Sequence, residues 1–199
     1  MRFCFTILVL LFSLSLQAAT QKLLILGDSL SAGYGMQQQQ GWVHLLQQQL
    51  EKNQSPWTLV NASISGETTA GGLARLPELM TKHQPQAVLI ELGGNDGLRG
   101  FPIAQIEKNL QQLLAEVKKH QAQPILMQKR IPPNYGPRYT KQFVALYPAL
   151  AEKHQATYWP FFMDQVAVKP ELMLADGIHP NEQAQPIIRD LIAPMLQKL

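Results

Sequence analysis

Residues 22–35, KLLILGDSLSAGYG, combine an apolar run with a glycine-rich polar turn. The apolar part, residues 22–26, is long enough for a buried parallel strand and too short for a core helix. Gly27 lets the backbone turn sharply at the end of this run, where open α/β sheets place their reactive groups. Ser29 is therefore a candidate nucleophile, with backbone N–H groups close to its hydroxyl. The simpler alternative is that Asp28 or Ser29 only caps a helix, as these residue types commonly do.

The rest of the chain alternates between strand-like and helix-like patterns. Short apolar runs predict strands at residues 57–60, 87–92, 124–128 and 157–161. Apolar residues that recur every three or four positions predict helices near residues 42–50, 73–82, 103–117, 140–154 and 187–195. We expect Pro77 to break one helix and Pro148 to kink or split another, because proline lacks a helical N–H. The alternation predicts an α/β fold of three layers, with a five-stranded parallel sheet between helices.

The N-terminal segment differs from the remainder of the 199-residue chain, which is 46% hydrophobic and long enough for one domain with a full core. Arg2 precedes an apolar run that continues to Leu16 and ends in small residues, the pattern of a secretory signal peptide. We expect cleavage after Ala19, which leaves residues 20–199 as a single domain, periplasmic or secreted. An uncleaved anchor stays open, because Gln17 stands where a small residue is usual.

Several classes of protein find no support in the composition. Cys4 is the only cysteine and lies in the segment expected to be removed, so the mature protein has neither a thiol nucleophile nor a cysteine-ligated zinc site. The formal net charge is only +3, and the adjacent basic pairs are Lys118-Lys119 and Lys129-Arg130, which does not indicate nucleic-acid binding. Phosphate-loop, dinucleotide, H-E-x-x-H and G-x-S-x-G motifs are all missing from the sequence.

Polar, glycine-rich turns follow three of the predicted strands. They are Gly27-Asp28-Ser29, Ser65-Gly66-Glu67 and Gly94-Asn95-Asp96. The carboxyl ends of parallel strands lie along one edge of a sheet, so these turns are expected to converge. A fourth polar group, Asp176 and His179, lies in the last loop. An imidazole can accept the proton of a serine at neutral pH, and a carboxylate can orient that imidazole. The pattern predicts a serine hydrolase that uses Ser29.

The four blocks occur in the order of Ser, Gly, Asn and His that gives the GDSL, or SGNH, hydrolases their name, and the chain resembles this family over nearly its whole expected mature length. The resemblance implies a flavodoxin-like fold and hydrolysis of acyl esters and thioesters, of the arylesterase, acyl-CoA thioesterase or lysophospholipase type, through an acyl-enzyme intermediate. It implies Ser29 as nucleophile, His179 as general base and then acid, and Asp176 as its orienting partner. It also implies an oxyanion hole made by the backbone N–H groups of Ser29 and Gly66 and the side-chain amide of Asn95. No metal or organic cofactor is implied.

The family likeness further indicates where an acyl chain would lie. Residues 97–102 follow the asparagine block, and their glycines allow the loop to move. We expect Leu98 and Phe101 of this loop to cover an apolar tail, and Ile131 and Pro132 to form another wall. The alternative is an ordinary surface loop with two apolar contacts.

Two other functions stay open beside acyl hydrolysis. One is a small-ester or carbohydrate deacetylase on the same fold, which a preference for short acyl groups would distinguish. The other is a non-catalytic binding protein, which the presence of every expected site residue disfavours. The expected partner is a small acyl ester or thioester, with no nucleic acid, no stable membrane insertion after signal removal and a monomer as the default.

Overall fold

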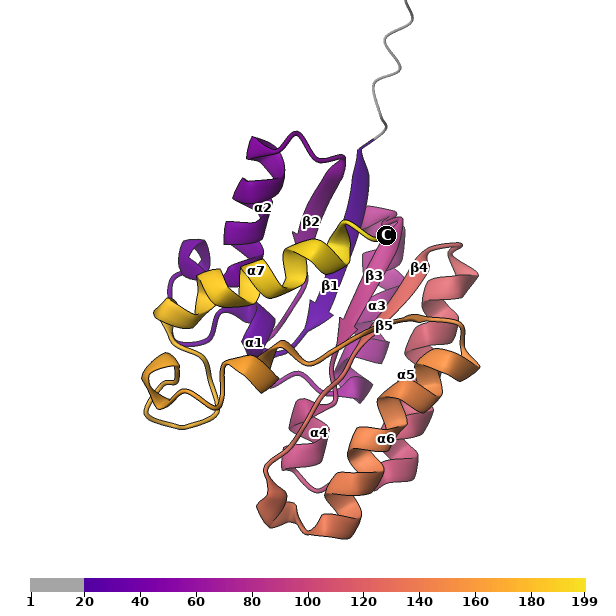
Figure 1. The fold of residues 1–199 in the computed structure, drawn as a ribbon. Helices are drawn as coiled ribbons and strands as arrows, with labels where there is room; N and C mark the ends of the chain where they lie inside the picture. The colour runs from indigo at the N-terminus through magenta and orange to yellow at the C-terminus, as the bar shows by residue number, and fades with distance from the viewer. Residues whose placement is uncertain (1–19) are drawn as a thin grey trace, which may run out of the picture.

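The computed structural model describes residues 20–199, and the expected signal peptide lies outside the described residues (Figure 1). Within this range the chain forms a five-stranded sheet from β1 (Gln21–Gly27), β2 (Trp57–Asn61), β3 (Ala87–Glu91), β4 (Gln123–Met127) and β5 (Thr157–Trp159). Every neighbouring pair is parallel, in the order β2-β1-β3-β4-β5. This is the flavodoxin-like order, and it confirms the predicted α/β fold.

Helices cover both faces of the sheet, which gives three layers (Figure 1). The helices are α1 (Ser29–Ala32), α2 (Trp42–Lys52), α3 (Thr69–His83), α4 (Gly94–Leu98), α5 (Ile103–Lys119), α6 (Pro137–Lys153) and α7 (Gln185–Leu196). Short 3₁₀ turns are η1 (Gln38–Gln40), η2 (Pro133–Tyr135), η3 (Phe162–Gln165), η4 (Pro170–Leu172) and η5 (Glu182–Ala184). In the described part of the chain, no helix has the length and apolar character needed to cross a membrane.

Strand β1 lies between two hydrophobic cores, one on each face of the sheet. Leu23 and Ile25 point into the core beneath α2 and α7. Leu24 and Leu26 point the other way, into the core beneath α3, α5 and α6. All four side chains are at most 1% exposed. Burial on both faces explains why this stretch is continuously apolar instead of alternating with polar residues.

Neither proline interrupts its helix, so the expected break at Pro77 and the expected split at Pro148 are wrong, while a kink at Pro148 stays a prediction. Helix α3 continues through Pro77, and α6 continues through Pro148 as one helix. An internal proline costs about 3 kcal/mol, but a fully buried leucine or methionine contributes about 1.5–3 kcal/mol. Leu76 and Met80 flank Pro77 and are buried against the sheet, so packing outweighs the local penalty. The last strand is shorter than expected because Pro160, which has no N–H for the ladder, follows Trp159.

A buried charge cluster, formed by Asp28, Glu91 and Lys129, joins the carboxyl ends of β1, β3 and β4. Lys129 Nζ lies 3.0 Å from Asp28 Oδ2 and also donates to Glu91 Oε1. Burial and the nearby charge of Asp28 raise the pKa of Glu91 to about 7, against the opposite effect of Lys129. Burial lowers the pKa of Lys129, but the two carboxylates outweigh it and the net shift is upward. The cluster therefore holds a charged lysine next to a carboxyl group that titrates near neutrality.

Replacing Glu91 with glutamine should change how stability depends on pH. The folded protein retains the Glu91 proton up to about pH 7, whereas an unfolded chain releases it near the ordinary value of 4.5. The stabilisation from this proton is complete below pH 4.5 and is lost as the pH rises through about 7. Relative to Glu91→Gln, the free energy of unfolding of the wild type should fall by about 3 kcal/mol across this window. Denaturant unfolding of both proteins at several pH values tests this, and a constant difference would contradict it.

Candidate active site

Ser29 lies at a tightly fixed turn between β1 and α1. Asp28 is the N-cap of α1, and its Oδ1 accepts a hydrogen bond of 3.1 Å from the backbone N–H of Leu30. The hydroxyl of Ser31 donates to Glu91 Oε2 at 2.6 Å. The residues before and after Ser29 are thus anchored to buried carboxylates, while Ser29 itself lines a cavity. Asp28 does cap a helix, so the capping alternative is correct for this residue. The hydroxyl of Ser29 takes no part in the cap and points toward His179.

Ser29, His179 and Asp176 form a continuous chain of hydrogen bonds. His179 Nε2 lies 2.9 Å from Ser29 Oγ, and His179 Nδ1 lies 2.7 Å from Asp176 Oδ2. The other oxygen of Asp176 accepts backbone N–H groups of Ile178 and His179 at 2.9 and 3.0 Å. The backbone N–H and imidazole of His179 lower the pKa of Asp176 to about 2. Asp176 is therefore a carboxylate throughout the neutral range and can hold the imidazole with Nε2 toward the serine.

The last loop holds His179 in place through its own backbone. Gly177, at φ 66°, forms the turn between Asp176 and His179 that a side chain would strain. The backbone N–H of Leu174 donates to the carbonyl of His179 at 2.8 Å, which closes the loop. Outside the loop, the ring of Tyr34 packs on the imidazole with centroids 4.3 Å apart. The imidazole is thus fixed on one side by the carboxylate and on its face by an aromatic ring.

Asn95 is connected to the turn that contains Gly66 by a hydrogen bond to Glu67, the residue after Gly66. Asn95 lies on α4, lines the same cavity as Ser29, and donates from Nδ2 to the carbonyl of Glu67 at 3.0 Å. Gly66 does not line the cavity, but Arg99 donates to its carbonyl at 3.1 Å. Its φ of 80° favours glycine. Ser29, Asn95 and His179 therefore converge on one cavity, as predicted. Gly66 does not line this cavity and is connected to Asn95 only through its neighbour Glu67.

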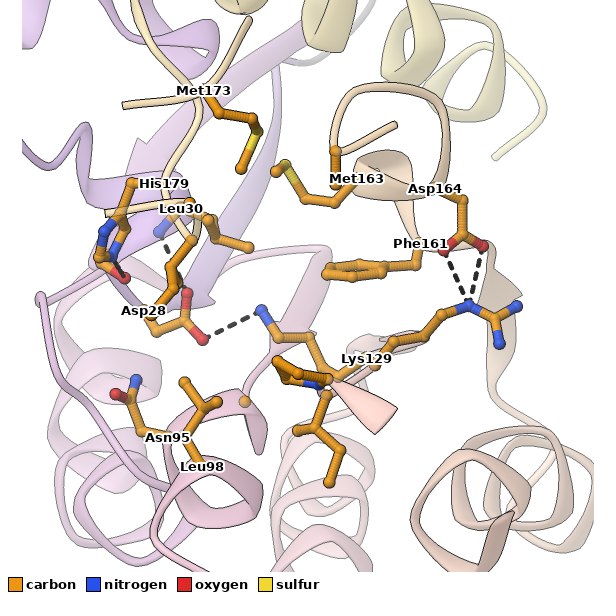
Figure 2. A pocket seen from close by; sticks show the side chains of 18 of the residues that line it. Asp28, Leu30, Asn95, Leu98, Lys129, Phe161, Met163, Asp164, Met173 and His179 are labelled. Atoms are coloured by element: carbon orange, nitrogen blue, oxygen red, sulfur yellow. Dashed lines mark hydrogen bonds and ion pairs between the residues drawn. The ribbon is translucent and has the colours of Figure 1, made fainter. Parts of the chain in front are cut away.

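A cavity of about 520 Å³ extends away from the serine (Figure 2). His179 and Asn95 lie at one side of it and Asp164 at the other, with Lys129 and Phe161 between them (Figure 2). Its apolar lining residues are Leu30, Leu98, Ile131, Pro132, Phe161, Met163, Ala167, Val168, Met173 and Ile178. Arg130 Nε pairs with Asp164 at 2.8 Å, and both side chains are about half exposed. The cavity suits an elongated apolar group that has one polar end beside Ser29.

Three of the four residues expected to contact an acyl chain line this cavity, namely Leu98, Ile131 and Pro132. Phe101 does not, which corrects the expectation for this residue. Its side chain packs against the core beneath α3, α5 and α6, and its carbonyl accepts the hydroxyl of Tyr139 at 2.6 Å. Leu98 and Phe101 are three positions apart and both pack in part against this core, but only Leu98, at the end of α4, also lines the cavity.

Sequence reasoning missed much of the cavity wall and the whole charge cluster. Phe161, Met163, Val168 and Met173 belong to irregular segments after β5, where no periodicity marks which side chains face a ligand. Glu91 carried a usable signal, because it is the only charged residue in a strongly apolar strand. Within residues 20–199, no group of three or more His, Cys, Asp or Glu side chains is arranged to hold a metal ion.

Comparisons with known proteins show which family this chain resembles. The profile of the GDSL-like lipase/acylhydrolase family matches residues 25–186. The chain is 55% identical to "Thioesterase 1/protease 1/lysophospholipase L1" of Escherichia coli K12 over 182 residues, 92% of this chain and 86% of the relative. The segments around Ser29 and Asn95 predict a likeness to this kind of enzyme, and the identity over the whole chain confirms it. An arylesterase of Vibrio mimicus is 50% identical over 192 residues, which are 96% of both chains.

A solved structure extends the likeness to the fold. The psychrotrophic esterase EstA from Pseudoalteromonas sp., in a structure inhibited by monoethylphosphonate, is 48% identical with a TM-score of 0.88. The match covers 89% of this chain and 97% of EstA. The profile match, the identities and the shared fold agree, and the chain therefore belongs to the GDSL-like lipase/acylhydrolase family of carboxylic ester hydrolases.

Proposed function

We propose that this protein hydrolyses acyl esters and thioesters, of the arylesterase, thioesterase or lysophospholipase type, through a Ser29–His179–Asp176 triad and an acyl-enzyme intermediate. The observation that carries the proposal is the unbroken hydrogen-bond chain from Ser29 Oγ through the imidazole of His179 to Asp176. A serine hydroxyl is a weak nucleophile until an adjacent base accepts its proton. The relatives named thioesterase, lysophospholipase and arylesterase support the choice of substrates.

In the proposed mechanism, His179 Nε2 accepts the proton as Ser29 Oγ attacks the acyl carbon. Asp176, held as a carboxylate, stabilises the imidazolium that forms. The tetrahedral intermediate collapses when His179 returns the proton to the leaving alcohol or thiol, which leaves the acyl group on Ser29. Water then attacks the acyl-enzyme with His179 again as base, and the carboxylic acid departs.

The proposed oxyanion donors are the backbone N–H groups of Ser29 and Gly66 and the side-chain amide of Asn95. An amide NH₂ carries two hydrogens. One hydrogen of Asn95 is used by the carbonyl of Glu67, and this bond orients the amide while the second stays available. A donor held in place before the reaction needs no reorganisation when charge develops, and loss of one typically costs roughly 100–1,000-fold in kcat.

The acyl chain is proposed to lie in the apolar cavity beside Ser29. An apolar lining favours a long chain over an acetyl group, because burial of each methylene contributes about 0.8 kcal/mol. The expected preference for long chains favours a hydrolase of long-chain acyl esters over the deacetylase alternative. We also propose that residues 1–19 are a signal peptide and that residues 20–199 act as an exported monomer on small-molecule substrates, on the basis of the N-terminal sequence pattern.

Comparison of the wild type with Ser29→Ala on six substrates tests the function directly. Acetyl and palmitoyl groups are each presented as an aryl ester, a CoA thioester and a glycerophosphate ester, and kcat/KM is measured. We expect palmitoyl turnover that falls by at least about a thousandfold in Ser29→Ala, as for loss of other serine nucleophiles. Turnover of acetyl esters alone would favour the deacetylase, and no turnover by folded wild type would favour a binding protein.

Leu98→Ala and Phe101→Ala form a matched pair that tests where the acyl chain binds. Leu98 lines the cavity and Phe101 does not. Leu98→Ala should lower kcat/KM for a palmitoyl ester about tenfold, a typical effect of lost apolar contact, and leave an acetyl ester within about twofold. Phe101→Ala should leave the ratio of palmitoyl to acetyl kcat/KM at the wild-type value. Equal loss on both esters in Leu98→Ala would contradict this placement of the chain.

A further inference from the structure

Lys129 is a buried cation that the proposed mechanism does not use. Its side chain is 2% exposed, although it forms part of the cavity wall beside Ser29. The ammonium group lies 3.0 Å from Asp28 Oδ2, bonds Glu91 Oε1, and sits 5.4 Å from the ring centroid of Phe161. Figure 2 shows Lys129 reaching across the cavity wall to Asp28. A lysine this deeply buried is rare unless it is paired, and Asp28 and Glu91 are its charged partners.

Both carboxylates that Lys129 contacts hold the turn that carries the nucleophile. Asp28 Oδ1 accepts the backbone N–H of Leu30, and Glu91 Oε2 accepts the hydroxyl of Ser31. The backbone N–H of Asp28 also points at Glu91 Oε2, at 3.4 Å. The turn is therefore attached to the charge cluster on both sides of Ser29, and Lys129 is the group that links the two attachments.

The glycines of two sequence motifs make room for this cluster. A Cβ at Gly94 would lie 3.1 Å from Lys129 Cε and 3.2 Å from Asp28 Oδ2. A Cβ at Gly27 would lie 2.5 Å from Glu91 Oε2. Contacts this short would push the charged groups apart, so glycine at these positions serves the cluster as well as the backbone. The block that carries Ser29 and the block that carries Asn95 thus both pack against it.

Removal of the ammonium alone would leave two carboxyl groups close together in a buried site. Two such groups cannot both stay ionised without a large cost, because nothing in the interior replaces the lost cation. Asp28 would keep only its hydrogen bond to Leu30, and Glu91 only its bonds to the turn. Glu91, which titrates near pH 7 in the intact cluster, would then retain its proton, and both side chains would lose the partner that fixes their positions. The backbone around Ser29 would be free to shift with them.

We propose that Lys129 is a positioning residue for the nucleophile, which holds Asp28 and Glu91 so that Ser29 keeps its place between His179 and Asn95. This inference rests on the proposed function. Misplacement of a reacting group by about 1 Å can cost roughly a hundredfold in rate. Since Lys129 acts through the turn and not through the acyl group, its loss affects short and long substrates alike.

The test measures kcat and KM of Lys129→Met on an acetyl and a palmitoyl aryl ester. Methionine has a similar length and no charge, so it removes the ion pairs with little change in volume. We expect kcat to fall at least about tenfold on both esters while KM changes less than about threefold, as for a group that acts in the transition state. Lys129→Arg, which restores a cation, should recover most of the lost kcat. Arg189→Met, which breaks the surface pair with Asp190 on α7, controls for the loss of one positive charge and should leave kcat unchanged.

A second variant keeps the test decisive if Lys129→Met does not fold. Glu91→Gln combined with Lys129→Met removes one charge of each sign, yet still deprives Asp28 of its cation, so kcat on the acetyl ester should stay at least about fivefold below the wild type. A folded single or double variant with wild-type kcat would overturn the inference. Loss confined to the palmitoyl ester would also overturn it, because Lys129 would then be only a wall of the cavity. A wild type that cleaves neither ester refutes the proposed function instead.

Discussion

All five strands of the described sheet run in the same direction, and the arrangement of the site depends on this constraint. A parallel sheet brings each turn that follows a strand to one edge, whatever the distance between strands along the chain. The turns after β1 and β3 carry Ser29 and Asn95 to this edge, and the segment after β4 carries Lys129 there. The strands themselves are apolar because helices cover both faces, so the polar residues can collect only where the strands end.

At that edge, two carboxyl groups lie in environments that shift their pKa values in opposite directions. Asp176 is accessible to water, and backbone N–H groups keep its pKa low. Glu91 is fully buried, and burial keeps its pKa high in spite of the ammonium group nearby. The first carboxylate is therefore dependably charged and suited to orient an imidazole. The second shares its environment with Asp28 and Lys129 and is suited to hold backbone in place. The same functional group, a carboxyl, is thus kept charged in one place and partly neutral in the other.

Those parts of the fold and site that follow from local patterns could be predicted from the sequence. The apolar run before Gly27 marked β1, and the polar turns marked the edge where Ser29 and Asn95 meet His179. Local sequence patterns did not predict the features that depend on tertiary packing. Pro77 lies inside a continuous helix because its neighbours are buried, and Leu98 and Phe101 both contact the core although only Leu98 lines the cavity. In the sequence Lys129 is only one member of an adjacent basic pair, since no local pattern shows that carboxylates from the ends of β1 and β3 contact it.

The hydrogen bond between Ser29 and His179 joins residues that are 150 positions apart in the sequence. His179 lies in the loop just before η5 and α7, so it follows every strand of the described sheet along the chain, and Ser29 precedes all but the first. Contacts of such long range form late, because the chain between them must first be ordered. In the proposed mechanism, a nascent or C-terminally truncated chain carries the serine without an acceptor for its proton. If the proposed triad carries the reaction, the architecture couples reactivity to completion of the fold, and an incomplete chain is expected to be inactive.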